Sequence, residues 1–410
     1  MRRSLTGRVA ALLSALVPAI VVLAPSAQAQ DATVKIGYAI AKTGPNAPGA
    51  GVTTLPNYQL WVKDVNDAGG LNVGGKKMKI EVVEYDDRSQ SEETVRAVER
   101  LATQDKVDFI LPPWGTANNL AVGPIFDRYG YPQLAGTSVT DRAADLAKRW
   151  PNSYWLLGTG GEYAEALVTL LEKLRGEGKI GDTVAMASIA DGFGIELAGA
   201  GRAALKKHGF KLAYDETYPL GTQDLAPIVN KAKALNPDVF IAFSYPPDTI
   251  GLSAQAQLLS FNPKVFYAGV GVAFPLYKDR FKDAAEGVVS LGGINASSPA
   301  VKQYIAHHKD VTGREPDRWA SLVTYASLQA LQQAIEKAGT IDKAAVSKEL
   351  ATGTFDTILG KFSFDKTTRK IPGFFTVGQW QKGEFIGLVP AQAEGAGQLI
   401  LPKPAWPKAN

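Results

Sequence analysis

The stretch Val107-Asp-Phe-Ile-Leu-Pro-Pro-Trp-Gly-Thr-Ala-Asn-Asn119 contains the pattern that decides the fold. Its first five residues, mostly apolar, predict a buried strand, and the Pro, Gly and Thr residues that follow predict a loop and the start of a helix. The same order of apolar run, polar loop and helical pattern recurs on both sides of this stretch. Such alternation is typical of parallel α/β sheets with helical connections.

The alternation occurs in two successive series, which predict two lobes of similar design. The first series has predicted strands at 34–40, 79–85, 107–111 and 131–135, with helices at 57–68 and 92–104. The second has strands at 154–157, 183–188, 211–214, 239–243 and 265–268. After residue 290 the pattern is mainly helical (301–309, 319–337 and 343–350), and it ends with a strand at 362–364 and a hairpin around 381–383. The segment from Ala391, rich in Gly, Pro and Ala, predicts a peripheral tail.

The composition excludes several classes of function. The chain has 410 residues, of which 45% are hydrophobic and 20% charged, enough for two domains with real cores. It has no Cys and only three His, and it lacks the G-x-S-x-G and H-E-x-x-H motifs. A disulfide scaffold, a Cys-ligated metal centre and a Cys nucleophile are therefore excluded. We expect no catalytic residue, no metal and no cofactor.

The N-terminal segment, residues 1–29, predicts a cleavable signal peptide. Arg2, Arg3 and Arg8 precede a long apolar run, and Ala27-Gln-Ala29 is a small-residue cleavage site. No Cys follows that could carry a lipid anchor, so we expect a soluble protein outside the inner membrane. Removing the three arginines from the 44 basic residues leaves 41, against 40 acidic ones. This balance gives no electrostatic reason to expect a nucleic-acid partner.

Candidate ligand-binding residues lie in loops that follow predicted strands, because ligands of open α/β sheets bind beyond the carboxyl ends of the strands. Trp114 and Thr116 follow one strand of the first series, and Gly136, Thr137 and Ser138 follow the next. Hydroxyls and N–H groups at a helix start suit a carboxylate. For one such loop alone, ordinary helix capping is the alternative.

The loops of the second series contain aromatic and apolar residues. Phe193, Tyr245 and Val270 follow three of its strands. The aromatic rings are suited to stack on a small ligand, with plain core packing as the alternative. The near-match to a phosphate-binding loop at Gly70–Lys77 lacks the Ser/Thr for magnesium and precedes a strand, so it predicts a turn.

Several stretches, in this order and spacing, resemble the leucine/isoleucine/valine-type periplasmic binding proteins of ABC importers. They are Val34–Tyr38 with Thr43-Gly-Pro45, Val65–Gly70, Val83–Asp87, Asp191–Gly194, Thr324–Ala326 and Gly360–Asp365. The resemblance implies a type I periplasmic binding protein fold: two Rossmann-like lobes, joined by three crossovers, that close on a ligand. It implies an N-terminal lobe of residues 30–155 and 290–357, a C-terminal lobe of residues 156–289 and 358–400, and a tail at 401–410.

The resemblance also implies roles for the candidate residues. Thr116 stands where the family binds the ligand carboxylate, and Gly136 and Ser138 lie in the loop that binds carboxylate and ammonium groups. Phe193 replaces a Tyr, and Tyr245 lies in a stretch that supplies a second aromatic contact. Val270 stands where amino-acid binders often place the Glu that pairs with the ammonium. A buried ammonium without a partner is costly.

The ligand is therefore expected to be a small amino acid, amide or carboxylate, including aromatic acids. It is not expected to be a plain α-amino acid held through its ammonium, unless Asp191 or Asp248 replaces the missing Glu. We expect a monomeric periplasmic substrate-binding protein, not an enzyme, that delivers its ligand to the permease and ATPase subunits of an ABC importer. A binding module for a signalling receptor remains open, and a secreted α/β hydrolase is disfavoured by the missing nucleophile motif.

Overall fold

The computed structural model describes residue 1, residues 33–372 and residues 374–407. The predicted signal peptide lies, Met1 apart, outside the described residues. From Thr33 onward the chain forms one compact unit. Within the described residues, no helix combines the length and the apolar character that crossing a membrane requires.

The first sheet has four strands in the order β2-β3-β1-β4. They are β1 (Thr33–Ile40), β2 (Leu71–Val73), β3 (Lys76–Asp86) and β4 (Phe109–Leu111). β1 is parallel to both β3 and β4, and its largely buried pattern fits a central parallel strand. β2 and β3 form an antiparallel hairpin, which confirms the turn predicted at Gly70–Lys77. The helices of this part are α1 (Ala47–Thr53), α2 (Leu55–Asp67), α3 (Ser91–Thr103), α4 (Thr116–Tyr129) and α5 (Ala143–Arg149).

A separate pair of parallel strands, β5 (Gln133–Ala135) and β6 (Ser153–Trp155), precedes the second sheet. The second sheet has the order β15-β14-β11-β10-β9-β7-β8. Its strands are β7 (Thr183–Ile189), β8 (Lys211–Tyr218), β9 (Val239–Phe243), β10 (Val265–Ala268), β11 (Val289–Leu291), β14 (Val377–Gln381) and β15 (Glu384–Val389). β7 to β11 run parallel, whereas β14 and β15 are antiparallel additions at one edge. The second sheet is therefore larger and more mixed than the first.

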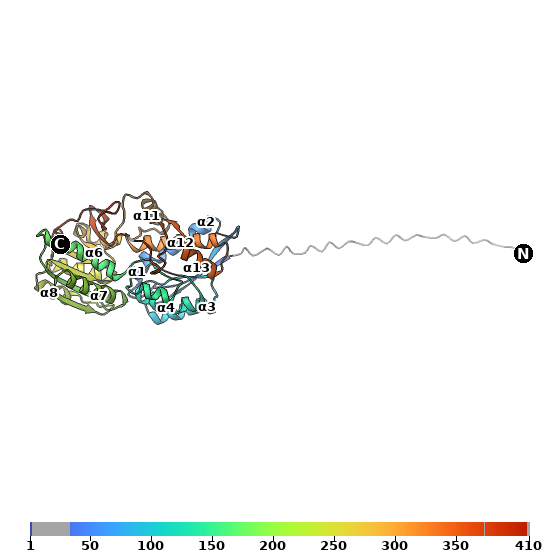
Figure 1. Cartoon of the computed structure of the whole chain (residues 1–410), viewed down its shortest axis with the longest axis horizontal. Coiled ribbons are helices and arrows are strands. Elements are labelled where there is room, and N and C mark those ends of the chain that lie inside the picture. Colours follow the sequence, from blue (N-terminus) through green and yellow to red (C-terminus); the bar gives the residue numbers. More distant parts are fainter. Residues whose placement is uncertain (2–32, 373, 408–410) are drawn as a thin grey trace. The chain divides into compact units, whose positions relative to one another are not determined.

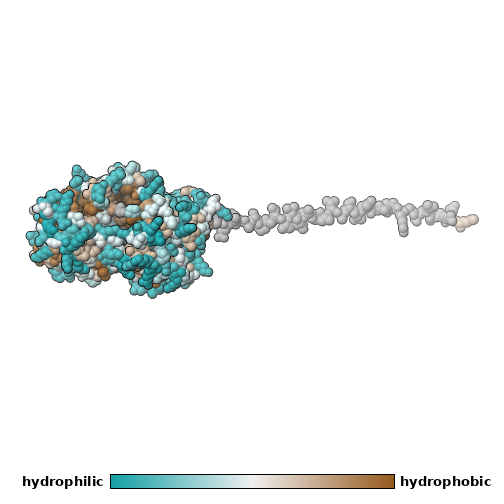
Figure 2. Space-filling model, viewed as in Figure 1, coloured by the Kyte–Doolittle hydropathy of each residue, from teal (hydrophilic) through white to brown (hydrophobic). Residues whose placement is uncertain are grey.

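The remaining helices lie around these sheets. They are α6 (Gly160–Gly176), α7 (Gly192–Lys207), α8 (Ala226–Ala234), α9 (Pro246–Leu258), α10 (Pro275–Phe281), the short 3-10 helix η1 (Lys282–Ala285), α11 (Pro299–Thr312), α12 (Ala320–Ala338) and α13 (Lys343–Thr352). A small hairpin of β12 (Phe355–Thr357) and β13 (Gly360–Phe362) follows. In Figure 1, α6, α7 and α8 lie on one side of the unit, and α2, α3, α4, α12 and α13 lie on the other. The surface seen in Figure 2 is mostly hydrophilic, with scattered hydrophobic patches.

Helix α1 lies between β1 and α2, where no helix was predicted from the sequence. This helix could not be predicted because it contains Gly49 and Gly51, and glycine is unfavourable in a helix interior. Pro48 lies in the first turn, where proline is well tolerated. Gly49 is required by packing, since a Cβ there would collide with the indole ring of Trp114. A tertiary contact, and not local preference, therefore explains the residue.

The C-terminal tail is packed onto the second sheet and is not peripheral, contrary to the prediction. Trp406 is only 8% exposed, and its Nε1 donates to the Phe261 carbonyl at 2.7 Å. Its ring meets Phe266 edge-on at 5.3 Å. Earlier in the tail, the Ile400 N–H donates to Gln379 Oε1 at 2.8 Å. The composition of the tail, rich in Gly, Pro and Ala, gave no indication that Trp406 and Ile400 bind to the rest of the protein.

Both sheets have a point where the strand order reverses. In the first sheet β1 lies between β3 and β4, and in the second β7 lies between β8 and β9. Ligands of doubly wound sheets bind in the crevice at such points, beyond the carboxyl ends of the strands. The loops after β4, β7 and β9 are therefore the first place to look for a binding site.

Candidate functional site

A small cavity lies where these loops meet. Its volume is about 20 Å³, and it is lined by Thr53, Trp114, Gly115, Thr137, Leu157, Phe193, Tyr245, Val270, Trp319 and Ala320. Five of the eight residues predicted from the sequence line it: Trp114, Thr137, Phe193, Tyr245 and Val270. They come from loops after β4 and β5 on one side, and after β7, β9 and β10 on the other. Strands far apart in the sequence thus contribute to one site.

Four of the ten residues that line the cavity are aromatic. Phe193 and Tyr245 stack with ring centroids 5.2 Å apart, and Trp114 meets Tyr245 at 4.8 Å. Hydrogen bonds fix the two indoles: Trp114 Nε1 donates to Thr53 Oγ1 at 3.0 Å, and Trp319 Nε1 donates to Tyr163 Oη at 2.9 Å. None of the described residues that line the cavity is charged. The wall is therefore suited to a flat or apolar ligand body.

A buried acceptor orients Tyr245. Its hydroxyl donates to Asp191 Oδ2 at 2.6 Å, and Asp191 Oδ1 accepts from the Gly194 N–H at 3.0 Å, which caps α7. Burial raises the pKa of Asp191, while these hydrogen bonds act to lower it. Burial, together with the charge of Asp191, raises the pKa of Tyr245 well above its usual value. The tyrosine therefore stays protonated and donates a hydrogen bond to Asp191.

The other side of the cavity is the start of α4. Gly115, the residue before this helix, has φ 88°, a conformation that favours glycine. Its N–H donates to Thr137 Oγ1 at 3.2 Å. Helix N-termini attract anions through their backbone N–H groups. A carboxylate or amide oxygen is the ligand group that suits this end.

Three predicted residues do not line the cavity. Thr116 is fully buried, and its hydroxyl is bonded to the backbone N–H and carbonyl of Val139 at 3.1 and 3.3 Å. Gly136 lies against Thr324, and the buried Ser138 hydroxyl has no partner among the described residues. In this conformation a ligand would first meet Thr137 and Gly115, the residue before α4. A direct role for Thr116 and Ser138 stays a prediction.

Five lining residues were not predicted from the sequence: Thr53, Gly115, Leu157, Trp319 and Ala320. Thr53 and Trp319 lie at the end of α1 and just before α12, outside the loops that follow the strands of the two main sheets. Trp319 could have been predicted, because a large aromatic residue directly before a long helix is a candidate ligand contact. No feature of the sequence pointed to Thr53, because the glycines of α1 argued against a helix there.

The cavity is closed. A volume of about 20 Å³ holds little more than one water molecule, whereas ligand sites usually measure roughly 300–1,000 Å³. Hydrogen bonds outside the cavity join α7 to the loop before α5: Glu196 accepts from Thr140 Oγ1 at 2.9 Å and from the Asp141 N–H at 3.2 Å. Any ligand larger than water requires these walls to move apart before they close around it.

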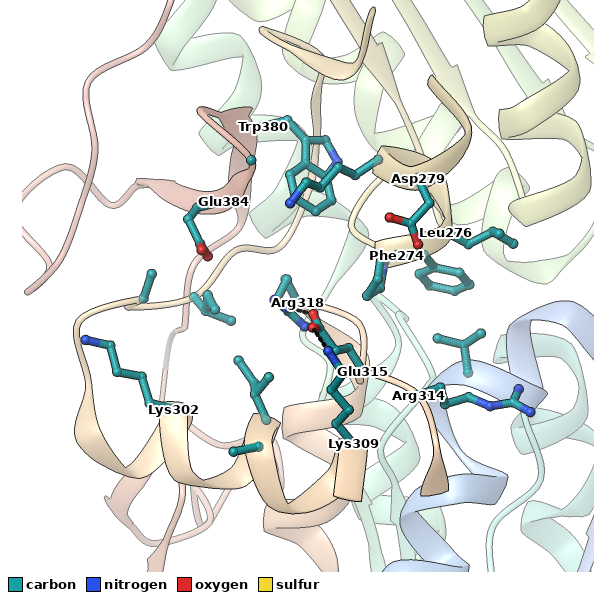
Figure 3. A pocket seen from close by; sticks show the side chains of 18 of the residues that line it. Phe274, Leu276, Asp279, Lys302, Lys309, Arg314, Glu315, Arg318, Trp380 and Glu384 are labelled. Carbon is teal, nitrogen blue, oxygen red and sulfur yellow. Dashed lines mark hydrogen bonds and ion pairs between the residues drawn. The ribbon is translucent and has the colours of Figure 1, made fainter. Parts of the chain in front are cut away.

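A larger groove of about 1090 Å³ lies elsewhere, between α10, α11 and the β14–β15 turn (Figure 3). It is strongly charged, but Glu315 already pairs with Arg318 at 2.6 Å and with Lys309 at 3.1 Å. Of the loops that line the small cavity, the one after β10 also reaches this groove, through Phe274, whereas those after β4, β5, β7 and β9 are not among its described lining residues. The small cavity, where residues that follow strands of both sheets meet, is therefore the better candidate site.

Asp248, behind Tyr245, should make stability depend on pH. The residue is 3% exposed, and this burial raises its pKa to about 6. A backbone hydrogen bond from Tyr245 lowers the pKa, and the charge of Asp191 raises it further. An unfolded Asp titrates near 3.9. Between about pH 4 and 6 the folded state therefore binds more protons than the unfolded state, and its stability falls as pH rises.

We expect Asp248→Asn to stabilise the protein relative to wild type by about 2 kcal/mol at pH 7 and not at pH 4, because the variant has no buried charge to form. Urea denaturation across this range measures the difference. Asp145→Asn, on the exposed α5, is the control and should change nothing. A difference that does not vary with pH would contradict the assignment.

Comparison with known proteins agrees with the fold described above. A family model described as periplasmic binding protein matches residues 33–384. The chain therefore belongs to the periplasmic binding protein family, which confirms the family and the type I fold predicted from the sequence. Members of this family are solute-binding proteins, and the family implies a periplasmic or extracellular location.

Individual relatives differ in what they bind. A Leu/Ile/Val-binding protein homologue from Brucella suis is 24% identical over 96% of this chain and 98% of its own length. A substrate-binding protein of a branched-chain amino acid transporter from Streptococcus pneumoniae, solved with isoleucine, has a TM-score of 0.74 at 21% identity, covering 86% of this chain and 97% of its own. A solute-binding protein of an ABC transporter from Rhodopseudomonas palustris, solved with 3,4-dihydroxybenzoic acid, has a TM-score of 0.73 at 21% identity, covering 87% and 96%.

Proposed function

We propose that this protein captures a small amino acid, amide or carboxylate in the cavity between its two sheets and delivers it to an ABC permease and its ATPase. One observation carries the proposal: Trp114, from the loop after β4, contacts Tyr245 after β9, and Tyr245 stacks on Phe193 at the start of α7. All three line a single cavity. The cavity thus lies beside the strand-order reversals of both sheets, where such folds bind ligands.

The lining supports this class of ligand. An oxygen-bearing end suits the start of α4, and an apolar or aromatic body suits the rings of the wall. The relatives that bind isoleucine and dihydroxybenzoic acid span the same range of chemistry. Export through a signal peptide at residues 1–29 would bring the protein to the periplasm as a soluble monomer.

The closed cavity supports a hinge mechanism. We place the moving bodies at residues 30–155 with 290–357 and at residues 156–289 with 358–400. The crossovers would lie at 154–159, 288–292 and 357–360. Glu196, which joins α7 to the loop before α5, would break its two hydrogen bonds on opening and remake them on closing.

A thermal-shift screen of the protein from Gln30 onward, with amino acids, amides and aromatic acids, tests the function. A ligand at 100 times its Kd should add about 2.7 kcal/mol to the stability. Trp114→Ala should abolish the shift, because the indole forms part of the cavity wall. Calorimetry on each responding compound then gives its affinity.

Lys302→Ala is the matched control, because Lys302 lines the larger charged groove and not the cavity. This variant should leave the thermal shift unchanged. In a separate experiment, solution scattering should show a smaller radius of gyration for the wild-type protein with ligand than without it. Loss of binding in Lys302→Ala with retention in Trp114→Ala would move the site to the larger groove. A complete panel without any shift would refute the proposed function.

A further inference from the structure

The hydroxyl of Tyr245 has a fixed polarity. A tyrosine hydroxyl has one proton to donate and lone pairs with which to accept. Here the proton is committed to Asp191 Oδ2 at 2.6 Å, a short charge-assisted hydrogen bond. Tyr245 lines the cavity, and a Cβ placed on Gly115, which also lines it, would lie 3.7 Å from the tyrosine oxygen. Towards a ligand on this side, the oxygen can therefore act only as an acceptor.

Asp191 is itself held in place. Its second oxygen accepts from the Gly194 N–H at 3.0 Å, so the carboxylate cannot rotate away without uncapping α7. An ionised carboxylate only accepts hydrogen bonds, so it cannot reverse the direction of the bond to Tyr245. The polarity at the cavity is thus imposed by a residue that does not line the cavity.

The surroundings reinforce this polarity. Asp248 is 3% exposed, and its Oδ2 has no hydrogen-bond partner among the described residues. After burial, the charges of Asp191 and Asp248 both raise the pKa of Tyr245. Val270, on the cavity wall, offers neither donor nor acceptor. An anionic group at this end of the cavity would be repelled, and an N–H group would be attracted.

We propose that Asp191, acting through Tyr245, restricts the ligand to compounds that present an N–H donor, as an amide or an amine, to the second-sheet side of the cavity. The inference rests on the proposed function and narrows its ligand class. Asp191 is a positioning residue, and Tyr245 is the contact. The acceptor that Val270 does not provide is supplied by the tyrosine oxygen.

The test uses matched pairs of probes that differ in the N–H donor. They are phenylalanine with 3-phenylpropanoate, leucine with 4-methylpentanoate, 4-aminobenzoate with benzoate, and benzamide with acetophenone. Calorimetry on the wild type should show the donor-bearing member of any binding pair roughly tenfold tighter or more, the discrimination expected for one hydrogen bond in a buried site.

Two variants separate this polarity from simple shape. Asp191→Asn keeps an oxygen to cap α7, but its amide nitrogen donates to Tyr245, which turns the tyrosine proton towards the cavity. The preference should then reverse in favour of the donor-free acids. Tyr245→Phe keeps the aromatic ring and removes the acceptor, so the two members of a pair should bind within roughly threefold of each other.

Tyr267→Phe is the matched control. Tyr267 is fully buried on β10, and its hydroxyl has no hydrogen-bond partner among the described residues. The same chemical change there should leave every ratio at its wild-type value. Circular dichroism and urea denaturation confirm that each variant is folded before its affinities are compared.

The results distinguish the two proposals. Binding by the wild type with a donor preference that Asp191→Asn reverses supports the inference. A wild type that prefers the donor-free members, or a ratio that Asp191→Asn leaves unchanged, overturns it while leaving the solute-binding function intact. Absence of binding by every probe, together with a silent thermal-shift panel, overturns the proposed function and this inference with it.

Discussion

Replacing Asp317 with alanine should lower the free energy of unfolding by about 3–5 kcal/mol. Asp317 is fully buried before α12, where Oδ2 accepts from the Ala320 N–H at 3.0 Å and Oδ1 from the Ser321 N–H at 2.6 Å. The variant leaves both N–H groups in the interior without an acceptor. Each such group costs about 1–3 kcal/mol.

The same substitution should weaken ligand binding, because Trp319 and Ala320 line the cavity and depend on this turn for their positions. Asp342→Ala is the matched control: Asp342 caps α13 by accepting from the Ala345 N–H at 2.8 Å, but it is exposed to water. It should cost only about 1 kcal/mol and leave binding unchanged. Equal losses for the two variants in urea denaturation would show that burial of Asp317 contributes nothing.

Half of the residues that line the cavity could be predicted from the sequence, because they follow strands of parallel sheets. Carboxyl ends of parallel strands share one edge, so residues that follow them converge without any knowledge of the packing. Trp114, Phe193 and Tyr245 were predicted in this way, and all three line the cavity. The position of β7 between β8 and β9 then brings Phe193 and Tyr245 together.

The rest of the wall could not be predicted, because it depends on contacts between distant segments. Thr53 lies on a helix whose glycines argued against a helix, and Gly49 is there to make room for Trp114, 65 positions further along. Asp191 was named from its loop position as a possible acceptor for the ligand. Its hydrogen bond to Tyr245 spans 54 positions and has no local sequence signal.

The tail illustrates the opposite error, because its composition predicted less structure than it has. Trp406→Ala should lower the free energy of unfolding by about 3–5 kcal/mol, the usual cost of removing a large buried aromatic side chain. The variant loses the edge-on contact with Phe266 and the hydrogen bond to the Phe261 carbonyl, and it removes the ring over which Lys403 Nζ lies at 3.6 Å. It also leaves a cavity beside the second sheet.

Trp406→Phe should cost less than Trp406→Ala, because it keeps the ring contact and loses the indole hydrogen bond, which is worth about 1 kcal/mol. Neither variant should change ligand affinity by more than roughly threefold, since the tail does not line the cavity. Urea denaturation and calorimetry on the same samples measure both quantities. If Trp406→Ala changed the stability by less than about 0.5 kcal/mol, the tail would be as peripheral in solution as its composition predicted.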